Sequence, residues 1–285
     1  MSSDISPAET TTPSVVPGST LSNIVNAIFN DYITSEQHQS QERILVALVG
    51  IPAAGKTTCA QILCTLVNQA IRERASQSQA TTSDYDYTQE NEGKSPRPSQ
   101  DASDGDPICV VVPMDGYHMT RAELAASDNP AEMFARRGAP WTFDTPALAR
   151  ALQRVKSNFG EEVRLNGWDH ALKDPSYDLI RVAPSTRIVI VEGLYLLLEM
   201  QPWKELILPL FSRRILLECD QDLADERGIY RNWKAGICDT LEASRQRWGA
   251  NDRLNAQLIM EHLDSSKLDA RLTQDDFTTW IQATK

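Results

Sequence analysis

The sequence has little that would carry it to or through a membrane. No apolar run approaches the roughly 20 residues that a membrane-spanning helix needs. No lysine or arginine occurs before Arg43, whereas secretory signals and mitochondrial presequences depend on basic residues near the N-terminus. We therefore expect a cytoplasmic protein without membrane association.

The chain also lacks the features of metal-binding, disulfide-rich and nucleic-acid-binding proteins. Its five cysteines are an odd number without metal-ligand spacing, so we expect reduced thiols in the core. The net charge of -11 leaves no basic surplus for general nucleic-acid binding. A length of 285 residues and a hydrophobic content of 41% are sufficient for a large globular core.

One internal segment is depleted of apolar residues. Residues 76–107 contain no Ile, Leu, Val, Met, Phe or Trp, and seven acids there stand against two bases. Such a segment cannot bury enough surface to offset the entropy lost on ordering. We predict a disordered acidic insertion, either regulatory or a spacer, within one domain over residues 20–285. A Ser-, Thr- and Pro-rich stretch over 1–19 is also predicted to be disordered.

The most informative stretch is residues 50–58, which fit the phosphate-binding pattern G-x-x-x-x-G-K-[ST]. An apolar run precedes it and a helical pattern follows. Glycines let backbone N–H groups point at phosphate oxygens, and the helix start adds its positive dipole end. Lys56 would add a charge near the β- and γ-phosphates, and the Thr57 hydroxyl would ligate Mg²⁺. The predicted nucleotide-binding residues are Gly50, Ile51, Pro52, Ala53, Ala54, Gly55, Lys56, Thr57 and Thr58.

Apolar runs predict a parallel sheet that is covered by helices on both faces. The predicted strands are 44–49, 108–112, 187–191 and 214–217, with 268–272 as a candidate fifth. Helical patterns cover 21–33, 146–157, 223–235, 240–250 and 251–263. The sequence therefore predicts a three-layer α/β domain.

Acidic residues follow two of the predicted strands. In open α/β sheets the ligand lies beyond the carboxyl ends of the strands. The phosphate loop follows the first strand, Asp115 follows the second and Glu192 follows the third. This arrangement suits phosphoryl transfer, because one carboxylate can orient or deprotonate an attacking hydroxyl while the other holds Mg²⁺.

Several ordered blocks resemble the uridine kinase, phosphoribulokinase and type I pantothenate kinase group. Residues 114–118 (MDGYH) are similar to its M-D-G/S-F/Y segment, and 136–146 (RRGAPWTFDTP) resemble the block that precedes a helix. Residues 168–175 (WDHALKDP) resemble its substrate block, and residues 191–193 (VEG) its E-G after a strand. The style of these blocks is most similar to fungal and bacterial kinase-like proteins within the group. The resemblance implies a P-loop kinase fold with a helical lid.

The resemblance covers residues 42–75 and 108–275 and implies roles by position. Asp115 matches the general base, and Glu192 matches the acidic residue at the metal. Residues 251–255 (NDRLN) resemble a further block, for which no role is implied. Arg227 and Arg231 look like the lid arginines that close on the γ-phosphate. The predicted substrate residues are Tyr117, His118, Arg136, Arg137, Asp144 and His170.

Structural alternatives remain for these residues. An aspartate after a strand can be a turn former or helix cap, which applies to Asp115 and Asp144. The two histidines can be structural, and the lid arginines can form surface ion pairs. The adjacent arginines Arg136 and Arg137 either form a solvated pair or contact an acidic or phosphorylated acceptor.

The residues favour an ATP- and Mg²⁺-dependent kinase that acts on a hydroxyl of a small metabolite. The resemblance implies a nucleoside, sugar or pantothenate-like acceptor. The alternatives are a P-loop ATPase or nucleotide switch without a small-molecule acceptor, and a binding module without chemistry. The sequence has no N-K-x-D guanine reader, and the intact Lys56 and Thr57 disfavour a module that has lost its chemistry.

Overall fold

A computed structural model describes residues 21–82 and 106–277, with side chains for all of these except 78–82. Its central sheet has five parallel strands in the order β2-β5-β1-β6-β7. They are β1 (Ile44–Val49), β2 (Cys109–Pro113), β5 (Ile188–Gly193), β6 (Arg213–Glu218) and β7 (Ala270–Thr273). The predicted parallel sheet is confirmed, and the candidate fifth strand belongs to it.

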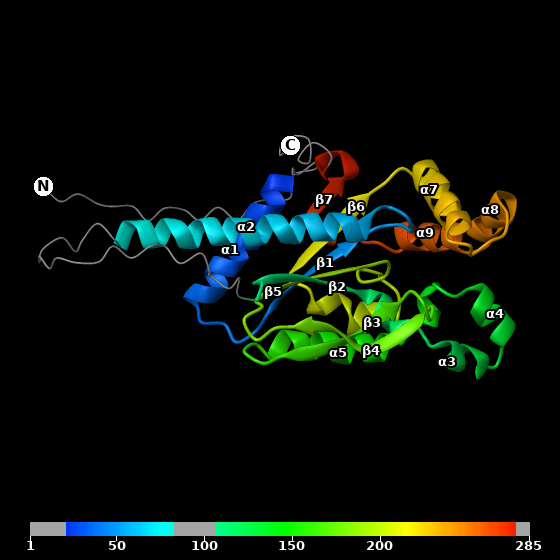
Figure 1. Cartoon of the computed structure of the whole chain (residues 1–285), viewed down its shortest axis with the longest axis horizontal. Helices are drawn as coiled ribbons and strands as arrows, with labels where there is room; N and C mark the ends of the chain where they lie inside the picture. The colour runs from blue at the N-terminus through cyan, green and yellow to red at the C-terminus, as the bar shows by residue number, and fades with distance from the viewer. Residues whose placement is uncertain (1–20, 83–105, 278–285) are drawn as a thin grey trace, which may run out of the picture.

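Helices cover both faces of this sheet. Helices α1 (Leu21–Gln37) and α2 (Lys56–Thr82) lie on one face, and α5 (Thr145–Ser157) lies on the other (Figure 1). The side chains of β1 alternate between the two layers: Val46 and Leu48 pack in the core with α1 and α2, while Leu45 and Ala47 pack in the core with α5. The three-layer α/β prediction is therefore confirmed.

Three further helices form the predicted lid at the carboxyl ends of the strands (Figure 1). They are α7 (Gln221–Lys234), α8 (Leu241–Ala250) and α9 (Asp252–Glu261). A buried carboxylate joins them: Asp225 on α7 accepts hydrogen bonds from Trp248 Nε1 of α8 at 2.7 Å and from Arg253 Nη1 of α9 at 2.6 Å. This contact fixes the three helices relative to one another.

An antiparallel hairpin of β3 (Val163–Asp169) and β4 (Asp174–Val182) was not predicted. Most residues of the hairpin are half-buried or exposed, and polar residues interrupt the apolar ones, so the sequence has no continuous apolar run there. The signal that could have found it is the alternation of the buried residues Val163, Leu165 and Gly167 with more exposed neighbours. The hairpin contains the block 168–175 that carries the family resemblance.

Short elements complete the described chain. They are η2 (Met114–Tyr117), α3 (Arg121–Ala125), α4 (Pro130–Ala135), η3 (Pro140–Thr142), α6 (Trp203–Leu206), η4 (Leu208–Leu210) and η5 (Ser265–Lys267). Within the described ranges, no helix combines the length and apolar character needed to cross a membrane.

The first residues of the expected insertion 76–107 continue helix α2 as far as Thr82. The helix therefore runs further than the composition suggested. Residues 83–105 of the insertion lie outside the described residues, as does the N-terminal stretch 1–19, whereas the last two residues of the insertion, Asp106 and Pro107, are described.

Candidate active site

The loop between β1 and α2 turns sharply at two residues. Ala53 and Gly55 have positive φ angles of 60° and 88°, and α2 begins at Lys56. Left-handed residues within a turn allow successive N–H groups to converge, and the start of α2 adds its positive dipole end. The loop therefore has the backbone form of an anion cradle.

Lys56 lies half-buried in this loop, and its Nζ donates to the carbonyl of Ile51 at 2.9 Å. Burial lowers the pKa of Lys56 from 10.5 to about 8, while the charges of Glu192 and Asp115 oppose that shift. A desolvated ammonium without a carboxylate hydrogen bond is stabilised by an anionic ligand.

Glu192 lies at the carboxyl edge of the sheet, between the strand that leads into the phosphate loop and the strand that leads to Asp115. Strand β5 lies between β1 and β2, so Glu192 pairs with Leu48 on one side and Pro113 on the other. Its side chain is only 6% exposed, and Oε1 accepts a hydrogen bond from the Thr57 hydroxyl at 2.8 Å. Burial raises the pKa of Glu192, while Lys56 and the Thr57 hydrogen bond lower it.

A hydroxyl and a carboxylate in contact form a donor set that suits Mg²⁺, which commonly takes one or two protein oxygens and completes its shell with phosphates and water. Among the described residues, no three His, Cys, Asp or Glu side chains are grouped closely enough to hold a metal by themselves. Thr57 and Glu192 are therefore a fitting but partial set of ligands.

Asp115 lies in η2, directly after β2, with an exposed side chain. Its neighbour Met114 is buried, and Met114 Sδ accepts a hydrogen bond from the Leu194 N–H at 3.0 Å. A Cβ at Gly193 would lie 2.1 Å from that sulfur, so the glycine after Glu192 is needed for the turns after β2 and β5 to pack.

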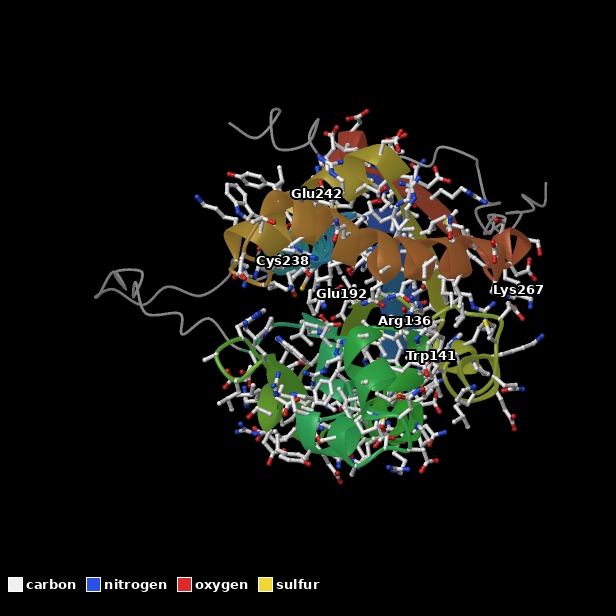
Figure 2. The ribbon with its side chains drawn as sticks, turned by 90° about the vertical axis from the view of Figure 1, so that its right-hand side faces the viewer. Arg136, Trp141, Glu192, Cys238, Glu242 and Lys267 are labelled. Atoms are coloured by element: carbon white, nitrogen blue, oxygen red, sulfur yellow. The ribbon has the colours of Figure 1, made fainter. Side chains whose placement is uncertain are left out.

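A single cavity of about 430 Å³ joins these groups. It lies between the strand ends and the lid, and Figure 2 shows Glu192 in the middle of the molecule, below the lid helices. The predicted residues that line it are Pro52, Ala53, Gly55, Lys56, Thr57, Thr58, Asp115, His118, Arg137, Glu192 and Arg231.

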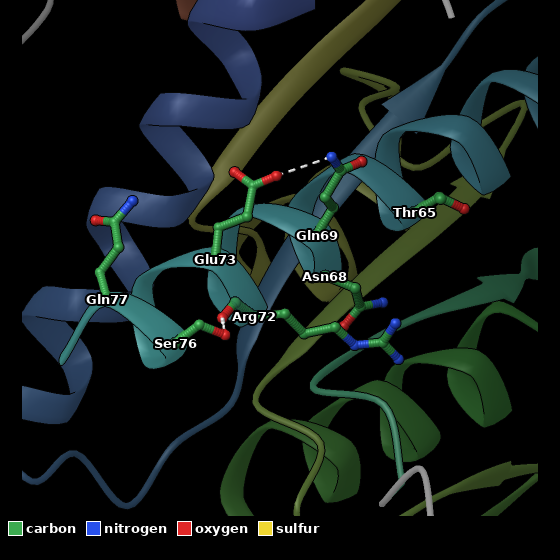
Figure 3. Close-up of a pocket in the computed structure, with 7 residues that line it drawn as sticks. All are labelled: Thr65, Asn68, Gln69, Arg72, Glu73, Ser76 and Gln77. Atoms are coloured by element: carbon green, nitrogen blue, oxygen red, sulfur yellow. Dashed lines mark hydrogen bonds between the residues drawn. The ribbon is translucent and has the colours of Figure 1, made fainter. Parts of the chain in front are cut away.

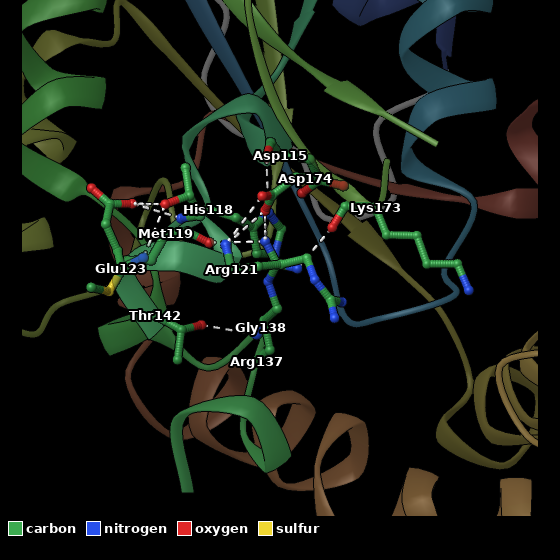
Figure 4. A network of polar contacts seen from close by, with 11 residues as sticks. Asp115, His118, Met119, Arg121, Glu123, Arg137, Gly138, Thr142, Lys173 and Asp174 are labelled. Atoms are coloured by element: carbon green, nitrogen blue, oxygen red, sulfur yellow. Dashed lines mark hydrogen bonds and ion pairs between the residues drawn. The ribbon is translucent and has the colours of Figure 1, made fainter. Parts of the chain in front are cut away.

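Arg137 lines this cavity but its charge is already matched. Its guanidinium pairs with Asp174 at 2.5 Å and donates to the carbonyls of Lys173 at 2.8 Å and Met119 at 2.9 Å (Figure 4). It also lies 5.0 Å from the ring centre of Trp168. Arg137 therefore joins the hairpin to the segment after β2.

His118 is held between aromatic rings. Its ring centre lies 4.0 Å from that of Phe143 and 4.9 Å from that of Trp168. Its Nδ1 lies 2.8 Å from the carbonyl oxygen of Asp115, and burial lowers the pKa of the imidazole. The neutral ring can thus donate to this carbonyl and hold the Asp115 turn in place.

Several predicted substrate residues lie outside the cavity lining. Asp144 caps α5 by accepting from the Ala147 N–H at 2.9 Å, which is the structural alternative considered above. Arg136 donates to the Ala250 carbonyl at 2.8 Å and to Asn255 Oδ1 at 3.1 Å, so it joins α4 to the lid. Tyr117 is buried in the core. His170 is exposed in the turn of the hairpin.

The two lid arginines have different surroundings. Arg231 lines the cavity, whereas Arg227 bonds to the side chain of Gln274. Gln274 in turn donates to the Ala54 carbonyl at 2.6 Å, so the Gln274 side chain links Arg227 to the phosphate loop. Only Arg231 is placed to meet a ligand in the cavity as it stands.

Sequence reasoning missed several residues that line the cavity, among them Asp252 and Asn255 of α9, Gly138 and Leu194. Asp252 and Asn255 belong to the block 251–255. Their spacing of three residues on a predicted helix places both on one face, and this signal could have assigned them to the site. Asn251 supports them by donating to the Arg137 carbonyl at 2.9 Å.

Hollows are also found outside the cavity, and two of them lie beside β6 and β7 and along α2. One of about 420 Å³ adjoins the ends of β6 and β7 and is bordered by Cys219, Leu223 and Gln274. The other, of about 720 Å³, is a polar groove along α2 with Asn68 and Arg72 in its wall (Figure 3). Asn68 clamps the edge strand β2 by bonding both the N–H and the carbonyl of Cys109 at 2.9 Å. One side chain in the wall of the α2 groove, Asn68, therefore holds strand β2 in place.

Comparison with known proteins identifies the family. No family model matches the chain. The uridine kinase-like protein C227.14 of Schizosaccharomyces pombe is 30% identical over 236 residues, which cover 83% of this chain and 85% of that protein. This chain belongs to the uridine kinase-like family of P-loop kinases. The family resemblance seen in the sequence is therefore confirmed.

Other members and structures agree with this assignment. The ATP-dependent kinase YFH7 of Lachancea thermotolerans is 34% identical over 189 residues, which are 54% of either chain. The crystal structure of YFH7 from Saccharomyces cerevisiae is described as that of a P-loop-containing kinase with a circular permutation. The match covers 87% of this chain and 98% of the YFH7 chain. Its TM-score is 0.67 at 22% identity, which shows the P-loop kinase fold.

Proposed function

We propose that this uridine kinase-like protein is an ATP- and Mg²⁺-dependent kinase that phosphorylates a hydroxyl of a small metabolite. The observation that carries the proposal is that Lys56, Asp115, Glu192 and Arg231 line one cavity together with the phosphate loop. Relatives named as ATP-dependent and uridine kinases support it. The acceptor belongs to the nucleoside, sugar or pantothenate-like class.

The reaction assigns a task to each of these side chains. Asp115, exposed at the tip of η2, accepts the proton of the acceptor hydroxyl as its oxygen attacks the γ-phosphorus. A bond forms between this oxygen and phosphorus, and the bond to the β-phosphate oxygen breaks to release ADP. Lys56 and Arg231 balance the negative charge on the transferred group, and the lid excludes water.

Thr57 and Glu192 would hold the metal, which when bound supplies charge neutralisation to the phosphates. The Thr57 hydroxyl already points at the Glu192 carboxylate, so little rearrangement is needed to present two oxygens. The hollow at the ends of β6 and β7 adjoins the phosphate loop through Gln274 and provides room for the nucleotide base.

The proposal is tested by measuring ADP release from Mg-ATP against a panel of hydroxylated metabolites, with product identified by transfer of labelled γ-phosphate. Asp115→Asn should lower the acceptor-stimulated rate by about 100-fold or more, because the base is lost. Full turnover by Asp115→Asn would disprove the assigned role. Nucleotide-dependent complex formation without acceptor-stimulated turnover would favour the nucleotide switch instead.

A further inference from the structure

The block 251–255 (NDRLN) is the part of the family resemblance that carries no implied role. Asn251 is the N-cap residue of α9, and Asn255 lies one helical turn further along. Both side chains are buried, at 2% and 1% exposed. A buried amide is costly unless it is hydrogen-bonded, so the partners of these two side chains indicate what the block does.

Both asparagines bond to the segment that follows helix α4. The Asn251 amide donates to the Arg137 carbonyl at 2.9 Å, and Asn255 Oδ1 accepts from Arg136 Nη2 at 3.1 Å. Arg136 Nη1 also donates at 2.8 Å to the carbonyl of Ala250, the last residue of α8. A guanidinium is a favourable partner there, because the end of a helix carries the negative end of its dipole. These hydrogen bonds join the segment to the junction of α8 and α9.

This segment, residues 136–138, is also bonded to the rest of the domain. The Gly138 carbonyl accepts from the Tyr195 hydroxyl at 2.6 Å, and the Arg137 guanidinium pairs with Asp174 of the hairpin at 2.5 Å. Gly138 and Arg137 both line the cavity, and so does the start of α9. The contact between the segment and the lid is therefore part of the cavity wall.

The shape of the Arg136 side chain suits this contact. Its two terminal nitrogens bond to two different oxygens, and its guanidinium carbon lies 5.4 Å from the ring centre of Trp141. Figure 2 shows both side chains at the boundary between the lid helices and the rest of the domain. A lysine carries one ammonium on a flexible stem and does not reproduce a planar fork with two partners. The contact therefore depends on geometry as well as on charge.

The lid transmits this contact to Arg231. Arg253 of α9 donates to Asp225 of α7 at 2.6 Å, and Arg231, on the same helix α7, lines the cavity. A second link runs from Arg227 of α7 through Gln274 to the phosphate loop. Release of α9 from its contact should therefore also displace the cation that α7 brings to the cavity.

We propose that Arg136, Asn251 and Asn255 are positioning residues that latch the lid to residues 136–138 and thereby retain a bound nucleotide in the cavity. They act through the lid, by keeping α9 and with it Arg231 in place. The inference rests on the proposed function, in which this cavity binds Mg-ATP, and adds the contact that keeps the lid closed. Loss of the two charge-assisted hydrogen bonds of Arg136 should speed nucleotide release by about tenfold or more.

The latch is tested by the rate at which nucleotide leaves, which requires no acceptor. The full-length protein is loaded with Mg²⁺ and the fluorescent analogue mant-AMP-PNP, and stopped-flow fluorescence follows its displacement by excess unlabelled AMP-PNP. Release from Arg136→Met should be about tenfold or more faster than from the wild type. Arg136→Lys should give an intermediate rate, because it keeps the charge and can bond to one of the two oxygens. The association rate should stay within about twofold, because the nucleotide enters while the lid is open.

A double-mutant cycle distinguishes the latch from a general packing defect. Asn255→Ala should also speed release, and its addition to Arg136→Met should have little further effect, because both changes break the same link. Arg150→Met, an exposed change on α5, is the matched control and should release nucleotide at the wild-type rate. Urea unfolding of each variant establishes that it is folded under the conditions of the assay.

Each outcome decides the matter. Equal release rates in the wild type and Arg136→Met, no rescue by Arg136→Lys, or independent effects of Arg136→Met and Asn255→Ala overturn the latch. Failure of the wild type to bind mant-AMP-PNP with Mg²⁺ overturns the latch together with the nucleotide site. If the latch variants release nucleotide faster but labelled γ-phosphate reaches no member of the metabolite panel, the latch stands and the proposed kinase function fails.

Discussion

The Thr57 hydroxyl and the Glu192 carboxylate lie 2.8 Å apart although 135 residues separate them in the chain. Parallel pairing of β1 with β5 brings them together, because Leu48 near the end of β1 pairs with Glu192. The first turn of α2 then places Thr57 over the strand end. Two oxygens from separate parts of the sequence thus meet at the site proposed for Mg²⁺.

Glu192→Gln should weaken the metal dependence of the enzyme. The amide keeps the shape of the side chain but loses the charge that a divalent cation requires, so the half-saturating Mg²⁺ concentration should rise by about tenfold or more. A Mg²⁺ titration of phosphoryl transfer at saturating ATP measures this. Glu205→Gln, an exposed change on α6, is the control. An unchanged Mg²⁺ requirement in Glu192→Gln would remove Glu192 from the metal site.

Lys56 gives a pH-dependent prediction. Because burial lowers its pKa to about 8, the side chain loses its proton near that pH in the ligand-free protein. A bound polyphosphate favours the charged form, so ATP binding above about pH 8 should take up protons, and affinity should fall as the pH rises further. Calorimetry in two buffers with different ionisation enthalpies measures the uptake. Lys56→Met should abolish it, and equal uptake in both proteins would assign the titration to another group.

The same shift predicts the pH dependence of stability without ligand. The unfolded lysine keeps its proton up to its ordinary pKa, so between about pH 8 and 10.5 the unfolded state binds more protons than the folded one. The contribution of Lys56 to the free energy of unfolding should therefore rise with pH in that window. Urea unfolding measures the free energy of unfolding of the wild type and of Lys56→Met across this pH range. The wild-type value minus the Lys56→Met value should increase with pH.

The sheet and the phosphate loop were predictable because their signals are local. A run of six apolar residues followed by the loop pattern fixes β1, the turn and the start of α2. Asp115 and Glu192 followed from the rule that ligands lie beyond strand ends. That rule did not give the order of the strands, in which β5 separates β1 from β2 and so places Glu192 between the strand before the phosphate loop and the strand before Asp115.

The lid side of the cavity was less predictable because packing across the chain decides it. Nothing near Arg136 in the sequence shows that its guanidinium bonds to Ala250 and Asn255. The position of Asp252 in the wall likewise depends on how α9 folds back over the strand ends. Charge alone suggested an anion-binding arginine pair, whereas Asp174 and backbone carbonyls occupy Arg137.

Arg43 should be a large contributor to stability. Its guanidinium is 1% exposed and makes five hydrogen bonds to backbone carbonyls at 2.6–3.1 Å. Arg43→Met would remove all five of these hydrogen bonds. The carbonyls of Asn158 and Ala183 keep a backbone N–H donor, but the loss of the charged donor should still lower the free energy of unfolding by about 3 kcal/mol or more. Arg150→Met, an exposed change on α5, should cost far less, about 0.5 kcal/mol. Urea denaturation measures both, and equal losses would contradict the role of Arg43.

Two glycines of the lid form a matched pair for the last prediction. A Cβ at Gly228 of α7 would lie 2.0 Å from Cη2 of Trp248, a side chain buried in α8, whereas a Cβ at Gly249 would meet nothing within 4 Å. Gly228→Ala must therefore push Trp248 out of place.

Overpacking of this kind costs about 1–3 kcal/mol, so Gly228→Ala should destabilise the protein by that amount in urea denaturation. Gly249→Ala adds a better helix former in open space and should be neutral or stabilising by up to about 1 kcal/mol. Because Trp248 donates to Asp225, its displacement should also loosen the contact that holds α9 against α7. Gly228→Ala should then raise the KM for the acceptor while Gly249→Ala does not. If both variants unfold at the same urea concentration, the packing of α7 on α8 does not require a residue without a side chain at position 228.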